Sequence, residues 1–408
     1  MSSLLIKGAR LFDPASGLDG LGDLLIEGAV IAVVGDVSPN GSEEVIEAQG
    51  LWALPGLIDL HVHLREPGQE DKETVATGTA AAAAGGFAAV ACEPNTRPPC
   101  DSAQRLGRVL DIAAHNALVR VLPKCAVTVG QLGKELTDFA ALREAGAVAA
   151  SDDGFAVKNG RIMREALLAA KQVGLPLTLH VDGVPMVARD IALAADLDCA
   201  VHFSHVSLAE EAELIARARA RGVRVTGEAT PHHLTLCRDD APEGDANFMM
   251  NPPLASASDR AALRAALAGG VLSVIASDHA PHTPEEKAKA YREAPPGVVG
   301  LETTLAVVWT YLVHQQRADA ETVVSAMTVG PAQVLGLKAP ALRPGAAADI
   351  VLFDPAHAWV VEPAKFKSKA RNCPFAGRKL RGRAVGAIFG GHIVMRDGSI
   401  LAAGAVES

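Results

Sequence analysis

The chain has 408 residues, of which 49% are hydrophobic and 21% charged, and its formal net charge is −9 at pH 7. This composition is typical of a globular protein with a large core and argues against a disordered chain. The acidic balance disfavours nucleic acid and anionic membrane as partners, because both attract basic surfaces. No apolar run approaches a membrane span, the first residues lack a signal-peptide pattern, and the six cysteines form no CxxC pair. We therefore expect a reduced, cytoplasmic protein.

Both ends of the chain carry short stretches that alternate apolar and polar residues between Gly and Pro punctuation. The predicted strands are 4–7, 23–26 and 31–34 near the start, and 348–353 and 387–394 near the end. This pattern is typical of an antiparallel β unit. We expect residues 1–55 and 341–408 to fold together into one small β-sandwich domain.

Between these ends, residues 56–340 alternate apolar strand candidates with Ala-rich helical stretches. The predicted strands are 57–63, 87–92, 119–127, 146–151, 176–181, 200–205, 223–228 and 271–276. The predicted helices include 72–84, 135–145, 164–172, 209–220 and 258–267. Eight strands in βα alternation predict an α/β protein with a TIM-like (β/α)8 barrel, and such barrels place their chemistry at the C-terminal strand ends.

Imidazoles and carboxylates follow several of these strands. His61 and His63 end the first strand two residues apart, so they project to the same side of an extended chain and form half of a divalent-metal site. If the extended geometry persists, Arg65 lies on that side too, whereas His202 has the opposite parity to His205 and is expected to face away from the barrel interior. Further strand ends supply the carboxylates and imidazoles Asp152, Asp153, His180, His205 and Asp278. Such a set predicts a hydrolytic metal site.

Longer motifs make the chain resemble the amidohydrolase superfamily and, within it, the dihydroorotase family, across essentially its whole length. They include GLIDLHVHLREPG, EPNTRPP, SDDG, HVS, EATPHHL, NPPL, SDHAPH and GLETTL. The resemblance implies zinc, one or two ions per subunit, held by His61, His63, Asp153, His180, His205 and Asp278. Many relatives bridge two metals with a carbamylated lysine. The fourth strand here offers no lysine, so Asp153 is the favoured bridge, with Asp152 as the alternative.

The resemblance also implies a substrate and a reaction. Arg65, Asn95 and His282 match residues that grip the α-carboxylate of the substrate, and Asn251 matches a residue that touches the pyrimidine ring. Asp278 is the implied catalytic residue, acting as general base and then as general acid. The implied activity is the reversible cyclisation of N-carbamoyl-L-aspartate to L-dihydroorotate in pyrimidine biosynthesis.

Two other functions stay open from the sequence. One is another cyclic amidase (a hydantoinase, dihydropyrimidinase or allantoinase), although such enzymes act on rings without the carboxylate that Arg65 would bind. The other is a catalytically weak scaffold for aspartate carbamoyltransferase. A homodimer and a transferase partner are both open, and segments 240–257 and 283–299 are candidates to close over the substrate. The chain departs from the family pattern at Glu93, where Met is more usual, and in a shortened segment after His180.

Overall fold

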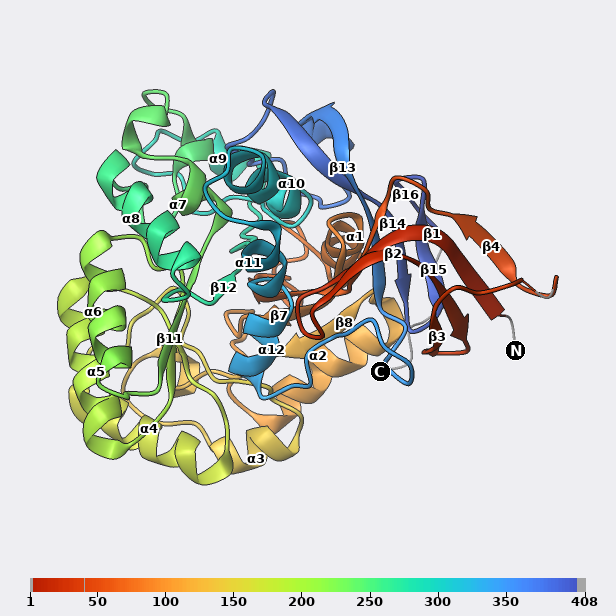
Figure 1. Cartoon of the computed structure of the whole chain (residues 1–408). Helices are drawn as coiled ribbons and strands as arrows, with labels where there is room; N and C mark the ends of the chain where they lie inside the picture. The colour runs from red at the N-terminus through yellow and green to blue at the C-terminus, as the bar shows by residue number, and fades with distance from the viewer. Residues whose placement is uncertain (1–2, 40, 402–408) are drawn as a thin grey trace.

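Strands from both ends of the chain pair in one nine-stranded sheet in the computed structural model, which describes residues 3–39 and 41–401. The order across the sheet is β16 (Ser399–Ile400), β15 (His392–Arg396), β14 (Lys379–Phe389), β13 (Ile350–Val360), β5 (Trp52–Pro55), β1 (Ser3–Asp13), β2 (Leu18–Glu27) and β3 (Val30–Gly35), with β4 (Glu44–Glu47) also paired to β1. Strand β5 is parallel to β1 and antiparallel to β13, so it joins the two ends of the chain. In Figure 1 these strands form the sheet on the right, red and blue together.

This terminal sheet has a core of its own. Alternate residues of its strands are buried in one cluster, among them Leu4, Ile6, Leu24, Ile26 and Ile350. The alternation is that expected of strands with one face turned to the core. The predicted strands 4–7, 23–26 and 31–34 lie inside β1, β2 and β3.

The predicted strand 387–394 is wrong as a single strand. Gly390 and Gly391 make a turn there with φ of 56° and 80°, which separates β14 from β15. A Cβ on Gly391 would lie 1.8 Å from the carbonyl oxygen of Gly28, so only glycine fits this turn.

Eight strand positions close into a ring in the middle of the chain. The first sheet comprises β6 (Leu57–Val62), β7 (Phe87–Cys92) and β8 (Arg120–Pro123), and the second comprises β9 (Thr178–Leu179), β10 (Val201–Phe203), β11 (Val225–Ala229) and β12 (Val274–Ile275), all parallel. The predicted fourth strand, 146–151, is only a bridge at Ala150, which pairs with Cys125 on one side and Leu177 on the other. The ring closes where Val62 pairs with His279.

Helices surround this barrel, as the left half of Figure 1 shows. The longer ones are α1 (Val75–Ala84), α2 (Ala103–Asn116), α4 (Gly160–Val173), α5 (Val184–Leu197), α6 (Ala209–Ala220) and α8 (Ala257–Ala268). Shorter ones are α3 (Phe139–Glu144), α7 (Pro231–Thr235), α9 (Pro284–Lys287), α10 (Thr304–Val308), α11 (Ala320–Ser325) and α12 (Val329–Leu335). Side-chain caps set several of the starts, including Thr74 before α1 and Ser256 before α8. The predicted helix 209–220 coincides with α6.

A row of aromatic rings joins the barrel to the terminal sheet. The ring of Trp52 on β5 lies 5.0 Å from that of Phe12 and 5.2 Å from that of Trp309, which directly follows α10. Trp309 in turn packs edge-on against Phe353 of β13 at 4.7 Å. The row belongs to a core cluster that contains residues of both the barrel and the terminal sheet, next to the separate cluster of the sheet. The predicted domain limits, 1–55, 56–340 and 341–408, stay predictions, and residues 1–2, 40 and 402–408 lie outside the described residues.

Two further findings bear on the sequence-based expectations. Within residues 3–39 and 41–401, no helix combines the length and apolar content needed to cross a bilayer. All six cysteines are buried and free.

Candidate active site

His61 and His63 enter the barrel from the end of β6, whose six residues are all buried. His61 Nδ1 lies 2.7 Å from Glu228 Oε1, and His63 Nδ1 lies 2.9 Å from Asn95 Oδ1. Each imidazole therefore donates from Nδ1 to an oxygen. In the neutral ring this contact fixes the tautomer and leaves the lone pair of Nε2 directed at the interior.

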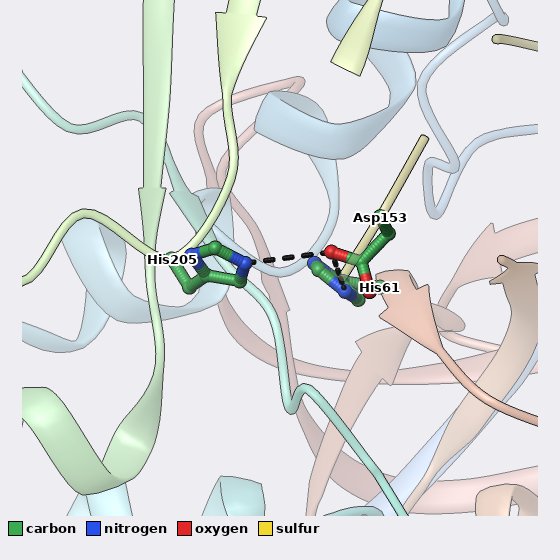
Figure 2. A group of neighbouring side chains, drawn as sticks. All are labelled: His61, Asp153 and His205. Atoms are coloured by element: carbon green, nitrogen blue, oxygen red, sulfur yellow. Dashed lines mark ion pairs between the residues drawn. The ribbon is translucent and has the colours of Figure 1, made fainter. Parts of the chain in front are cut away.

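Asp153 lies at the centre of the cluster. Its Oδ1 is 3.3 Å from His61 Nε2, 3.2 Å from His180 Nδ1 and 3.4 Å from His205 Nε2. Its Oδ2 is 3.4 Å from His63 Nε2. Figure 2 shows Asp153 beside His61, with dashed lines from one carboxylate oxygen to both His61 and His205. One carboxylate thus faces four imidazoles.

Asp152 turns away from this cluster. Its Oδ1 accepts hydrogen bonds from the backbone N–H groups of Val127 and Thr128 at 2.8 and 3.1 Å, and its Oδ2 accepts from the Thr128 hydroxyl at 2.5 Å. Burial raises the pKa of Asp152 to about 6, although these hydrogen bonds oppose the shift. Asp152 therefore holds the loop after β8, and Asp153 is the carboxylate that faces the histidines.

Asp278 completes the cluster from the loop after β12. Its Oδ1 lies 3.3 Å from His63 Nε2 and 3.6 Å from His61 Nε2. Asp278 and His205 adopt positive φ angles of 47° and 34°, and Arg65 adopts 63°. Left-handed backbone is unfavourable for residues with a Cβ and persists where surrounding structure imposes it, often at functional sites. Strained strand ends thus aim these side chains inward.

The six predicted ligand residues therefore meet in one place. Two triads each have their ligand atoms within 4.8 Å of one another: His61 with Asp153 and His205, and His61 with His63 and Asp278. His180 adjoins them, since its Nδ1 lies 2.9 Å from His205 Nε2.

The donor set fits a divalent cation. His61 Nε2 is buried and makes no hydrogen bond, although it faces Asp153 and Asp278. Burial opposes a charge on His61, yet the carboxylates of Asp153, Glu93 and Asp278 outweigh it and raise its pKa well above the usual value. Neutral imidazole nitrogens and carboxylate oxygens at this spacing are ligands that zinc prefers. The excess of negative charge around His61 favours a cation at this position.

The predicted substrate-binding residues lie around the same cluster but differ in their hydrogen-bond partners. Arg65 is half-buried, which lowers its pKa to about 10, and its Nε donates to Pro281 O at 3.2 Å. The extended geometry on which the parity expectation for Arg65 depended does not persist, because β6 ends at Val62 and Arg65 has a left-handed backbone. Asn95 contacts the cluster through His63.

His282 and Asn251 occupy more peripheral positions. The ring nitrogens of His282 lie 3.1 Å from Glu286 Oε2 and 3.0 Å from Pro296 O. Burial, with the positive charge of Arg65 second, lowers the pKa of His282 to about 3. Asn251 Nδ2 lies 3.3 Å from His180 Nε2, and both residues line a cavity of about 470 Å³ beside the cluster.

Glu228 is a residue that the sequence did not single out. It is fully buried, and its second oxygen, Oε2, lies 3.1 Å from His202 Nε2. The expectation that His202 faces away from the interior is wrong, because β10 ends at Phe203 and the turn at His205 interrupts the alternation. A glutamate inside the otherwise uncharged strand VTGEA was the available signal.

Comparisons with known proteins agree with this geometry. A family model described as Dihydro-orotase-like matches residues 50–186. The chain is 44% identical to a protein named Dihydroorotase from Pelotomaculum thermopropionicum, over 97% of this chain and 99% of the relative. It is 45% identical to a Dihydroorotase from Anaeromyxobacter dehalogenans, over 97% and 98%. The chain belongs to the dihydroorotase family.

Solved structures show the fold of this dihydroorotase family member in other proteins. The L-hydantoinase (dihydropyrimidinase) from Arthrobacter aurescens superposes with a TM-score of 0.91 at 23% identity, covering 100% of this chain and 99% of that one. A dihydropyrimidinase from Brevibacillus agri gives 0.87 at 21%, covering 98% and 96%. Identities this low establish a shared fold only. The chain thus shares the barrel and β-sandwich fold of these proteins, and its relatives named Dihydroorotase identify it as a hydrolase.

Proposed function

We propose that this chain catalyses the reversible cyclisation of N-carbamoyl-L-aspartate to L-dihydroorotate, with zinc at one or two positions in the barrel. The observation that supports it best is the convergence of four imidazoles and two carboxylates at the strand ends of a chain whose nearly full-length relatives are named Dihydroorotase. The six buried free cysteines suit a reducing compartment, so we place the activity in the cytoplasm.

The proposed zinc ligands are His61, His63, Asp153, His180, His205 and Asp278. Asp153 is proposed as the bridge between two metal positions, because its two oxygens face different histidines. When bound, zinc supplies Lewis acidity toward a carbonyl and lowers the pKa of a water molecule to about 7.

Asp278 is the proposed proton carrier. Burial disfavours its charge, yet the neighbouring imidazoles of His61 and His63 outweigh burial and lower its pKa to about 2. An ionised carboxylate can accept a proton from the attacking water and deliver it to the departing ring nitrogen. In the biosynthetic direction, Asp278 takes the proton from the carbamoyl nitrogen.

Substrate recognition is assigned to Arg65, Asn95, His282 and Asn251. The bond from Arg65 Nε to Pro281 O orients the guanidinium, and we propose that its terminal nitrogens form a forked contact with the substrate carboxylate. Asn95 adds its amide beside His63. For His282 to reach the substrate, one of its present ring contacts, with Glu286 or with Pro296, has to be exchanged.

One preparation tests the proposal. Zinc content is measured on the purified protein, and hydrolysis of dihydroorotate is compared with that of hydantoin and allantoin. Bound zinc with a clear preference for dihydroorotate is expected. Preference for hydantoin or allantoin would assign another cyclic amidase, and zinc-free protein without turnover would favour the scaffold for aspartate carbamoyltransferase.

A further inference from the structure

Glu93 and Lys124 form an ion pair that lies wholly inside the barrel, with both side chains 0% exposed. Glu93 directly follows β7 and Lys124 directly follows β8, and Lys124 Nζ also donates to Thr178 Oγ1 on β9 at 3.1 Å. An ion pair in such a place is costly to desolvate, and a well-packed apolar pair is often at least as stable. Stability alone therefore gives little reason for these charges.

Glu93 faces the site described above. Its Oε1 lies 3.8 Å from His61 Nε2, a distance close to the 3.6 Å that separates Asp278 Oδ1 from the same nitrogen. Both His61 Nε2 and Glu93 Oε2 are buried and make no hydrogen bond. Buried polar atoms without partners are rare in folded proteins and require a specific explanation. A cation beside His61 would provide it for His61 Nε2, which Glu93 faces through Oε1.

We propose that Glu93 contributes a further carboxylate ligand to the metal centre at His61, and that Lys124 and Thr178 hold it in position. Oε1 is the oxygen that faces His61 Nε2, and Lys124 pairs with this same oxygen and orients the carboxylate, while Oε2 has no protein partner. The charge of Lys124 offsets part of the negative charge that Glu93 adds to Asp153 and Asp278. This inference rests on the proposed metal site and adds to it a ligand outside the predicted set of six.

Metal binding to the chelator-stripped protein tests this role without reference to turnover. Zinc affinity is measured by competition with a chromophoric chelator. Cobalt(II) titration is followed by visible absorption, which reports the number and type of ligands. Glu93→Gln is expected to weaken zinc binding by at least about 10-fold and to change the cobalt spectrum, because a neutral amide is a poor replacement for a carboxylate ligand.

Two further variants separate a metal ligand from a structural ion pair. Glu93→Gln leaves Lys124 buried without a counter-charge, which could destabilise the fold. The double variant E93M/K124M avoids this, because it replaces the ion pair by apolar side chains of similar length. It is expected to fold and to lose as much zinc affinity as Glu93→Gln. Lys124→Met keeps the carboxylate but removes the partner that positions it, so this variant is expected to lose less zinc affinity than E93M/K124M. Asp190→Asn is the matched control, a buried carboxylate paired with Arg189 on α5, and should leave zinc affinity unchanged.

The outcomes distinguish this inference from the proposed function. If the unmodified protein binds zinc and E93M/K124M binds it equally, with the same cobalt spectrum, Glu93 is not a ligand and only the inference fails. If the unmodified protein binds neither metal, the proposed metal site itself fails and the inference falls with it. Weaker binding in both Glu93 variants, with normal binding in Asp190→Asn, supports the inference.

Discussion

Asp278 combines a strained backbone conformation with an ionised carboxylate that faces the histidine cluster. Its positive φ aims the carboxylate at His61 and His63, and its pKa of about 2 keeps it ionised at neutral pH. Asp278→Ala should lower kcat for dihydroorotate hydrolysis by at least about 100-fold, the usual contribution of a positioned proton carrier. Zinc should stay partly bound, because the other five proposed ligands remain. Metal analysis beside steady-state kinetics checks both points, and normal turnover would remove Asp278 from the mechanism.

Arg65 is expected to act on binding rather than on proton transfer. Arg65→Ala should raise KM for dihydroorotate by at least about 10-fold, because one charge-assisted contact with a carboxylate is worth about 1.5–3 kcal/mol. The effect on kcat should be smaller. Arg65→Lys is the informative companion: it keeps the charge but loses the fork, so its KM should be intermediate. Unchanged kinetics in both variants would contradict the assignment.

The candidate site was predictable to the extent that it follows from strand ends. His61 is the last residue but one of β6, and His63, Asp153, His180, His205 and Asp278 come shortly after strands or after the bridge at Ala150; the barrel brings such positions together. Residues inside the strands were harder to assign. Glu228 and His202 lie within β11 and β10, where parity decides orientation, and parity fails once a strand ends early. Lys124 was missed because a lysine after a strand ordinarily faces solvent.

At the scale of elements, the loop before α10 is tied to the segment after β13. Glu302 Oε1 accepts hydrogen bonds from the backbone N–H groups of Lys367 and Ser368 at 2.8 and 3.1 Å. Burial raises the pKa of Glu302 to about 7, although these bonds oppose the shift. The glutamate is therefore more readily protonated in the folded chain than in the unfolded chain, where its pKa is about 4.5.

This shift predicts a pH dependence. Between about pH 4.5 and 7 the folded state binds more protons at Glu302 than the unfolded state does, so its contribution to stability is lost as the pH rises. Glu302→Gln removes this titration and keeps an acceptor for the two N–H groups. The Tm of Glu302→Gln minus that of the unmodified protein should therefore increase from pH 5 to pH 8, as measured by thermal unfolding. Glu293→Gln, at an exposed position, is the control, and a pH-independent difference would contradict the expectation.

Elements were predictable where local pattern decides them. The helix 209–220 and the strand 87–92 were located to the residue, and the strand 57–63 to within one residue, because their apolar runs and flanking polar residues are clear. The predicted fourth strand is only a bridge at Ala150 in the structure, because the chain there pairs with Cys125 and Leu177 through this single residue. Such pairing depends on distant segments, which a local pattern does not contain.

At the scale of the whole molecule, stability depends on the aromatic row between barrel and sheet. Trp309 is 5% exposed and touches both Trp52 and Phe353, which belong to strands from opposite ends of the chain. Trp309→Ala should cost about 3–5 kcal/mol, the usual loss for a buried tryptophan, and should lower the Tm. Because one core cluster contains residues of both parts, barrel and sheet should still unfold in one calorimetric transition. Two separated transitions, only one of them shifted, would contradict this coupling.

The position of β5 has a consequence for how the protein is made. This strand leaves the ribosome early, but its antiparallel neighbour β13 begins only at Ile350. At about 5–20 residues per second, synthesis of the intervening chain takes on the order of tens of seconds. During that time the nascent chain carries an open strand edge, which is a template for intermolecular pairing. Pairing of β13 with β5 thus covers the open edge and removes this route to aggregation.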